Sequence, residues 1–279
     1  MHTKNPTSLY SLITSIFTNR ELIWNMVKRN VLGKYKGSFF GLFWSFLNPI
    51  LMLSIYTFAF SVVFQAKWGL EQEGHLDFAL ILFASLTIFN LFGDVLRDSP
   101  ILVLTQPNFV KKVIFPLEIL PVISLLTALT HALISLSLFI LIYGLLHLSL
   151  PWTIIYLPFV FIPIMLIALG ISFFLSATGV YFRDLGHFMG HIVTVLLFTS
   201  PVFFSLERMP KIMQKAMIVN PIAYLLENAR FVMVYNKSPE WLLLGLYTVI
   251  SLLFTKLGLV ISENSKRFCR RNLKLWNSN

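Results

Sequence analysis

Few residues in this 279-residue chain have the types and spacing of a catalytic centre. His187 and His191 stand four positions apart, a spacing that places two imidazoles on one helical face and could supply two metal ligands. No third ligand stands near them in the sequence, so we expect two polar side chains at a helix entrance and no metal site. The sequence also lacks the Gly-x-x-x-x-Gly-Lys-Ser/Thr, strand-linked Gly-x-Gly-x-x-Gly and His-Glu-x-x-His patterns.

The positions of the carboxylates argue against ion-coupled chemistry inside a membrane. An acidic side chain within a membrane helix is a common mark of proton or ion transport. Asp94, Asp98, Glu118 and Asp184 all stand near the predicted ends of apolar segments, where water or headgroups reach them. We therefore expect that the chain is not an enzyme, has no cofactor of its own, and takes its energy from a partner protein.

The composition indicates an integral membrane protein. Hydrophobic residues make up 57% of the chain and charged residues 12%, against about 25% charged residues in a typical soluble domain. The mean hydropathy is +0.77. The net charge of +10 does not predict nucleic-acid binding, because the basic residues share no soluble face and positive residues collect in the cytoplasmic segments of membrane proteins. The single cysteine, Cys269, excludes an internal disulfide, and residues 1–38 lack the features of a signal peptide.

The apolar segments predict an all-α fold with six transmembrane helices. A helix needs about 20 apolar residues to cross the hydrocarbon core. Six segments approach or exceed that length: 39–65, 78–101, 117–147, 152–181, 185–204 and 241–262. They form a transmembrane domain at 39–262, between a cytoplasmic N-terminus at 1–38 and a basic cytoplasmic tail at 263–279. Residues 205–238 mix charged with apolar residues, so we expect a re-entrant helical hairpin at the outer face.

The stretch before the first span predicts a basic amphipathic helix at the membrane interface, over residues 20–36. At about 100° per residue, one face is apolar and suits acyl chains. That face holds Ile23, Trp24, Val27, Val31 and Tyr35. The neighbouring polar arc holds Glu21, Asn25, Lys28, Arg29 and Lys36. Thr18 and Glu21 have the spacing of a capping box, which predicts the start of this helix.

An even number of spans places both termini on one side of the membrane. Basic residues gather in 1–38 and 263–279. Because positive residues concentrate on the cytoplasmic side, both termini are predicted to be cytoplasmic.

Aromatic residues are unusually frequent, with 27 Phe, 9 Tyr and 6 Trp. On the first span, five phenylalanines share one arc if Pro49 leaves the helical phase intact: Phe39, Phe43, Phe46, Phe60 and Phe64. One interpretation is packing against lipid and neighbouring helices. The other is a conduit whose rings stack against the apolar C–H faces of sugars. Periodicity alone leaves both open.

A series of short motifs follows in order along most of the chain. They are Arg20-Glu21-Leu22, Lys34-Tyr35-Lys36-Gly37-Ser38, Gly41-Leu42-Phe43-Trp44, Leu47-Asn48-Pro49, residues 108–116, residues 118–121, Phe182-Arg183-Asp184-Leu185, Ser200-Pro201-Val202-Phe203-Phe204, Asn220-Pro221 and Glu227-Asn228-Ala229-Arg230. Each motif is weak alone, but their ordered combination resembles the permease subunits of polysaccharide-export ABC transporters. Phe204 departs from the family pattern, which has Tyr or Trp there.

The resemblance implies a half-transporter that forms a homodimer and pairs with two cytoplasmic ATPase subunits, which would bind ATP and Mg. Such permeases lie among the lipids of the bacterial cytoplasmic (inner) membrane. They export lipid-linked polysaccharides, with O-antigen the first expectation here and capsule or wall teichoic acid the next.

The resemblance also implies roles for individual residues. Contacts to the ATPases would come from Glu21, Lys28, Arg29, Asn108, Lys111 and Lys112. The channel would be lined by Phe39, Phe43, Trp44, Phe46, Tyr56, Phe60, Phe64, Phe198, Phe203 and Phe204. Hinge and gate positions would be Arg183, Asp184, Pro201, Asn220, Pro221, Glu227 and Arg230.

Simpler roles stay open for several of these residues. Lys111 and Lys112 could only anchor a cytoplasmic loop, and Arg183 with Asp184 could only end the fourth span. Glu227 and Arg230 could form a surface ion pair worth about 0.3–0.5 kcal/mol.

Two other functions also stay open. The first is an ABC permease for a drug or small lipid, which has no need of an aromatic path. The second is a membrane-embedded glycosyl- or phosphotransferase. It would need an acidic metal-binding cluster, for which Asp94, Asp98 and Asp184 are the candidates and lack a recognisable pattern.

Overall fold

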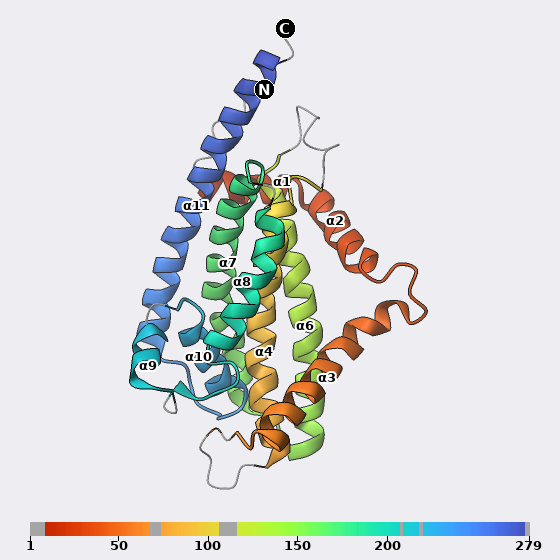
Figure 1. The fold of residues 1–279 in the computed structure, drawn as a ribbon, viewed down its shortest axis with the longest axis vertical. Helices are drawn as coiled ribbons and strands as arrows, with labels where there is room; N and C mark the ends of the chain where they lie inside the picture. Colours follow the sequence, from red (N-terminus) through yellow and green to blue (C-terminus); the bar gives the residue numbers. More distant parts are fainter. Residues whose placement is uncertain are drawn as a thin grey trace.

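The computed structural model describes residues 9–66, 68, 74–105, 116–182, 184–206, 209–217 and 220–276, with the backbone alone for residue 216 and for 265–276. These residues are helical or irregular and contain no strand, which confirms the all-α prediction for the described part of the chain. Figure 1 shows an elongated helical bundle in which α1 and the C-terminal end of α11 lie at one end and α9 and α10 at the other.

The described helices follow the apolar segments of the sequence. In chain order they are α1 (Leu9–Thr18), α2 (Arg20–Gly33), η1 (Gly41–Phe43), α3 (Trp44–Thr57), η2 (Phe58–Val63), α4 (His75–Asp98), η3 (Ser99–Ile101), α6 (Ile119–His147), η4 (Trp152–Tyr156), α7 (Leu157–Gly179), α8 (Leu185–Thr199), α9 (Lys211–Met217), α10 (Ala223–Met233) and α11 (Trp241–Trp276). Long apolar runs form helices in a membrane because every backbone N–H and C=O must be paired within the segment.

Within the residues that the structure describes, five stretches are long and apolar enough to cross a membrane. They are Gly41–Val63, His75–Ile101, Ile119–His147, Trp152–Gly179 and Trp241–Asn264. The predicted fifth span at 185–204 was too long: α8 ends at Thr199, and residues 200–204 form turns and bends. Fifteen residues rise only about 22 Å, against a hydrocarbon core of about 30 Å. Pro201 explains the end of the helix, because the residue before a proline disfavours helical geometry.

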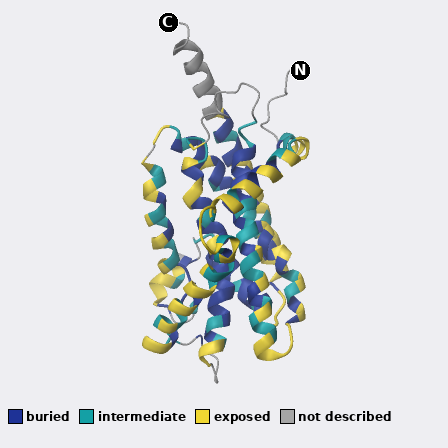
Figure 2. Cartoon of the chain, turned by 90° about the vertical axis from the view of Figure 1, so that its right-hand side faces the viewer, coloured by how far each residue is buried: buried dark blue, intermediate teal, exposed yellow. Residues whose placement is uncertain are grey.

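The core of the bundle is built around α4. In the apolar window of its span 83% of residues are buried, against 11% in the span that contains α3. Figure 2 shows the same division, with buried residues along the central helices and exposed residues on outward faces. α4 packs against α6, α7, α8 and α10, so it is the element that positions its neighbours.

α7 and α11 approach each other closely. A Cβ atom built on Gly258 of α11 would lie 2.3 Å from the carbonyl oxygen of Gly170 in α7. Thr255 donates a hydrogen bond from its hydroxyl to the Leu166 carbonyl across the same contact, at 2.6 Å. Small residues and side-chain hydroxyls are the usual means by which membrane helices approach closely.

The apolar face of α2 packs on protein. Ile23, Met26, Val27 and Val31 are buried together with the first turn of α6, which corrects the prediction that this face meets acyl chains. Trp24, assigned to the apolar face, is 68% exposed. The predicted capping box is also absent: α2 begins at Arg20 after Asn19, which makes no side-chain capping bond.

The segment expected as an outer-face hairpin contains α9 and α10 at the end opposite α1 (Figure 1). α10 packs against α4, α7 and η4 and buries most of its residues. Its Tyr224 hydroxyl donates to the Glu240 carbonyl at 3.3 Å. α10 is therefore part of the packed bundle.

The first span does not keep a single helical phase. It opens with the 3₁₀ turn η1, continues as α3 around Pro49, and ends in the π-helix η2. The turn before it needs glycine, because Gly37 and Gly41 have φ of 88° and 50°. The predicted arc of five phenylalanines assumed one uninterrupted phase, and η1 and η2 both break that phase.

Candidate functional site

A polar groove opens between α2, α3, α4, α6 and α8. One part is a cavity of about 380 Å³ bordered by α3, α4, α6 and α8, and the second is a cavity of about 760 Å³ beside the end of α2. The two parts share wall residues: Lys34, Asp94, Arg97, Ala128 and His131. The two cavities are therefore adjacent, and together we call them the α4–α6 groove.

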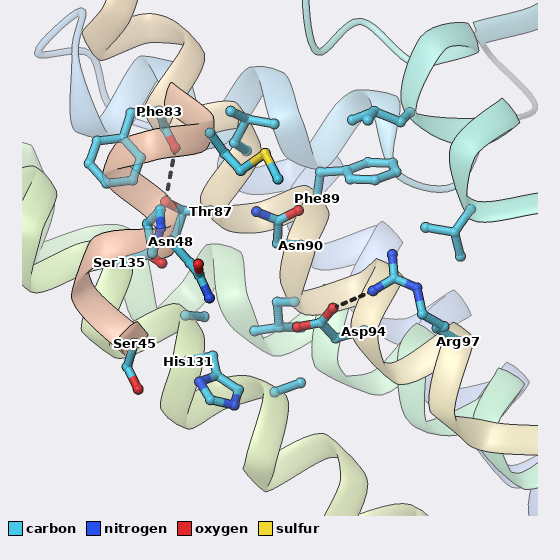
Figure 3. Close-up of a pocket in the computed structure, with 18 of the residues that line it drawn as sticks. Ser45, Asn48, Phe83, Thr87, Phe89, Asn90, Asp94, Arg97, His131 and Ser135 are labelled. Carbon is cyan, nitrogen blue, oxygen red and sulfur yellow. Dashed lines mark hydrogen bonds and ion pairs between the residues drawn. The ribbon is translucent and has the colours of Figure 1, made fainter. Parts of the chain in front are cut away.

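Helical spacing brings the polar side chains of this groove together. Asn90, Asp94 and Arg97 follow one another at four and three positions on α4, so they share a face. His131 and Ser135 do the same on α6, four positions apart. Figure 3 shows Asn90 of α4 and Asn48 of α3 directed into the space between the helices, with His131 on a neighbouring wall.

The charges of the groove gather at the end near α2. Asp94 and Arg97 form an ion pair of 3.1 Å on α4. Because both side chains are partly exposed, such a pair contributes about 0–1 kcal/mol and leaves Arg97 available to exchange partners. Lys34, the residue after α2, borders the same cavities. The ring of Tyr35 meets the edge of His131 with centroids 6.3 Å apart.

The structure brings several of the predicted channel aromatics into one cluster around Phe60 and Phe203. Phe203 stacks on Phe60 with centroids 4.3 Å apart and on Phe198 at 5.4 Å, and meets the edge of Tyr56 at 5.2 Å. Phe204 contacts the edge of Phe60 at 5.7 Å. Phe203 is 1% exposed, so in this structure it is a packing residue. Phe198 and Phe204 remain exposed.

The other predicted channel aromatics are divided along the first span. Phe39 is 97% exposed, and Phe43 is also exposed. Trp44 and Phe46 are half-buried at the start of α3. Phe64, after η2, contacts Phe60 with centroids 5.7 Å apart, at the opposite end of the span. The first span thus carries two aromatic groups, separated by most of its length.

Most of the predicted hinge and gate residues take part in hydrogen bonds, mainly with neighbouring segments of the chain. Asn220 donates from its amide to the Ser200 hydroxyl at 2.8 Å, and its side-chain oxygen accepts from the Ile222 backbone at 3.0 Å. The Pro221 carbonyl accepts from the Tyr247 hydroxyl of α11 at 2.7 Å. These bonds fix the turn before α10 to the end of α8 and to α11.

Arg230 is the central residue at this end of the molecule. It is 4% exposed, and its guanidinium donates to the Pro201 carbonyl at 2.6 Å and to the Leu226 carbonyl at 3.3 Å. The same group lies over the Trp68 ring, 4.4 Å from the centroid. Burial lowers the pKa of Arg230 to about 10, so the group stays charged at neutral pH. A surface ion pair with Glu227 therefore does not describe its environment.

The predicted ATPase-contact residues divide between α2 and a segment outside the described residues. Glu21, Lys28 and Arg29 are exposed on α2. Asn108, Lys111 and Lys112 lie outside the described residues, as does the hinge residue Arg183. Its neighbour Asp184 is exposed at the start of α8, where its carbonyl accepts from the His187 and Phe188 backbones.

Sequence reasoning did not assign Asn48, Asn90, His131 and Ser135 to a site. The available signal was their polarity within apolar spans, because polar side chains at membrane depth are costly and usually functional. Among the described residues, no group of three or more His, Cys, Asp or Glu could hold a metal ion.

Comparison with known proteins places the chain in a family. Residues 21–234 match the family described as ABC-2 type transporter. The chain is 25% identical over 232 residues to the O-antigen export system permease protein RfbA of Myxococcus xanthus, covering 82% of this chain and 86% of that protein. It is 23% identical over 249 residues to the protein of the same name from Klebsiella pneumoniae, covering 88% and 92%. The match spans the first four candidate membrane spans, α8, α9 and α10, so this integral membrane protein belongs to the ABC-2 type transporter family.

Proposed function

We propose that this chain is the permease subunit of an ABC transporter that exports a lipid-linked polysaccharide, O-antigen first and capsule or teichoic acid next. The observation that carries the proposal is the similarity to two O-antigen export permeases over more than four-fifths of the chain. The protein would lie in the bacterial cytoplasmic (inner) membrane with both termini in the cytoplasm. The shared end of α1 and α11 (Figure 1) supports this orientation.

The proposal includes an ATPase partner, as membership of an ABC transporter family implies. The partner would bind ATP and Mg and would carry out hydrolysis. Two such subunits would contact the exposed residues Glu21, Lys28 and Arg29 of α2 and the 106–115 segment. The burial of α2 against α6 supports this role, because movement of α2 would be passed directly to a membrane helix.

The proposal also includes a second copy of the chain. α3 and α8 leave large apolar side chains exposed, among them Ile55 and Phe58 on the first span and Phe188, Val195 and Phe198 on α8. Lipid could cover these faces, but a homodimer joined there would enclose a path beside the α4–α6 groove. Chemical crosslinking between copies through cysteines placed at Ile55 and Val195 would test this arrangement.

Export can be tested by removing the chain from the bacterium that produces it. We expect the polysaccharide to be synthesised and to accumulate on its lipid carrier inside the cell, with little at the cell surface. Restoring the chain should restore surface polysaccharide. An unchanged surface polysaccharide would contradict the proposed function.

Coupling to the ATPase can be tested by the double variant Lys111→Glu and Lys112→Glu. If these side chains meet the ATPase, charge reversal should abolish export and co-purification of the ATPase while membrane insertion stays intact. The control is Lys215→Glu with Lys237→Glu, which reverses two exposed charges at the other end of the molecule. Normal export by the first variant would leave these lysines as loop anchors only.

A further inference from the structure

The α4–α6 groove reaches the hydrocarbon depth of the membrane. Asn90 stands fifteen residues after the first residue of α4 and eight before its last, or about 22 Å and 12 Å along the axis. His131 stands twelve residues from the start of the 29-residue α6, or about 18 Å. Polar side chains at this depth face the interior of a bundle or a water-filled cavity and usually mark the path of a substrate.

The two amides in the groove have unused hydrogen-bonding capacity. Asn48 and Asn90 are exposed to the groove, and neither side-chain amide has a hydrogen-bond partner among the described residues. Each amide offers two N–H donors and a carbonyl acceptor. Ser135 and Thr194 add hydroxyls on α6 and α8, and Phe198 of α8 adds an exposed ring. Amides and hydroxyls beside an aromatic ring are suited to a sugar, which has hydroxyls at its edge and C–H groups on its faces.

The charged end of the groove is suited to a different chemical group. Arg29, Lys34 and Arg97 border the part nearest α2, together with the carboxylates Asp94 and Asp98. Three cations face two carboxylates there. Arg97 forms a partly exposed ion pair with Asp94. Guanidinium and ammonium groups bind phosphate oxygens by charge-assisted hydrogen bonds. The groove thus offers neutral polar groups in its interior and a basic end.

The size of the groove limits what it can hold. Its two parts, about 380 and 760 Å³, lie in the range of about 300–1,000 Å³ that is usual for small ligands. A polymer does not fit in such a volume, but one or two sugar units with a phosphate do.

From these observations we infer that the α4–α6 groove binds the junction between lipid carrier and polysaccharide, with the first sugar between Asn48 and Asn90 and the adjoining phosphate at Lys34 and Arg97. This inference rests on the proposed function and adds a binding site on each subunit to it. The lipid would stay in the bilayer while its headgroup enters beside α3. The site would then bind the part of the substrate that does not change with the length of the polymer.

Binding can be measured with the full-length chain purified into lipid nanodiscs. The probe is a polyprenyl diphosphate that carries one N-acetylglucosamine, and the comparison lipid is the same polyprenyl diphosphate without sugar. Each lost amide contact should weaken binding by about threefold to tenfold. We expect this loss of affinity for the sugar-bearing lipid in both Asn90→Leu and Asn48→Leu. The affinity of these variants for the comparison lipid should be unchanged.

The control variant is Asn264→Leu, an exposed asparagine on α11. Lys34→Gln should weaken both lipids equally, because both carry the diphosphate. Thermal unfolding of every variant shows whether the fold is intact, and Asn90→Gln, which keeps the amide, should retain more binding than Asn90→Leu. If Asn90→Leu and Asn264→Leu bind the sugar-bearing lipid equally, the groove does not bind the sugar.

Two further measurements are needed. The first distinguishes a lipid-linked ligand from a soluble one, and the second distinguishes failure of the groove inference from failure of the proposed function. Binding of soluble N-acetylglucosamine 1-phosphate as tight as that of the lipid-linked probe would overturn the assignment to a lipid-linked substrate. If export requires the chain but is unchanged by substitution of Asn48, Asn90 and Lys34, the groove is not the binding site. That result would leave the proposed function intact. Surface polysaccharide that is independent of the chain would overturn the proposed function itself.

Discussion

At the scale of single residues, Arg230 joins three segments that are distant in the sequence. Its hydrogen bonds reach the turn after α8 and its own helix, while its cation lies over the ring of Trp68, between η2 and α4 in the sequence. A buried cation is expensive unless its donors are satisfied. Two carbonyls and an aromatic face contact this one, and the Glu227 carboxylate also favours its charge, so the group can hold this end of the molecule together.

Replacing Arg230 should loosen the packing between these segments. Arg230→Met removes both hydrogen bonds and the stacking, and we expect the free energy of unfolding to fall by about 1.5–3 kcal/mol. Arg230→Lys keeps the charge but loses the planar fork, so it should recover only part of the loss. Thermal unfolding in detergent measures both changes.

The control for this prediction is Lys237→Met. Lys237 is exposed and lies 6.0 Å from the Phe231 ring, so its removal should change stability by less than about 0.5 kcal/mol. Equal melting temperatures for Arg230→Met and Lys237→Met would show that Arg230 does not hold these segments.

Two phenylalanines of the first span should respond differently to alanine. Phe60 stacks on Phe203, and its truncation should cost about 1–3 kcal/mol, below the cost for a fully buried ring. Phe43 is exposed, so Phe43→Ala should change stability by less than about 0.5 kcal/mol. If Phe43 lines the export path, its variant should export less polymer while melting normally. Normal export and normal melting would leave Phe43 without that role.

At the scale of helices, the contact between α7 and α11 depends on the absence of side chains. The carbonyl of Gly170 occupies the position that a Cβ on Gly258 would need. Gly258→Ala should separate the two helices and destabilise the protein by about 1–3 kcal/mol, the usual cost of overpacking.

Gly245→Ala provides the matched control for this change. Gly245 lies on the same helix, and a Cβ there meets nothing within 4 Å. Its variant should melt at the wild-type temperature or slightly above it, because alanine favours the helix. Equal melting temperatures for the two variants would show that the α7–α11 contact does not require the absence of a side chain at Gly258.

The positions of the helices can be predicted from the sequence more accurately than the environment of each helix, lipid or protein. The spans that contain α3 and α4 have similar hydropathies of 1.8 and 2.0, yet 11% and 83% of their windows are buried. Lipid tails are as apolar as leucine, so hydropathy cannot distinguish a helix that faces lipid from one that faces protein. The packing of α2 on α6 was missed for the same reason, since its apolar face suits either environment.

The candidate site was predictable in part. Aromatic residues in the first span and near Phe203 were singled out, and the structure brings several of them together. The amides of Asn48 and Asn90 were not assigned, because their spacing on separate helices matches no chemical motif. The burial of Arg230 also escaped prediction, since its partners Pro201 and Trp68 lie far from it in the chain.

At the scale of the whole molecule, the shared end of α1 and α11 leads to a prediction of topology (Figure 1). Cys269 is the only cysteine of the chain, and it follows the candidate span Trp241–Asn264 on α11. A membrane-impermeant maleimide should therefore label wild-type protein in inverted vesicles and not in intact spheroplasts.

The reverse result is expected for a variant with its cysteine at the other end. Ser238 is exposed just before α11, so Cys269→Ser combined with Ser238→Cys should be labelled in spheroplasts. Labelling of wild-type Cys269 from outside would reverse the orientation. It would also place the α2 residues away from any cytoplasmic ATPase.

The π-helix η2 makes the first span sensitive to its length. A π-helix is equivalent to an α-helix with one residue inserted, and one residue corresponds to a rotation of about 100°. Deleting a single residue between 61 and 63 would restore α-helical winding and change the spacing of Phe60 and Phe64, which are now in contact, from four positions to three. Over evolutionary time, related chains should accept many substitutions in this turn but few insertions or deletions.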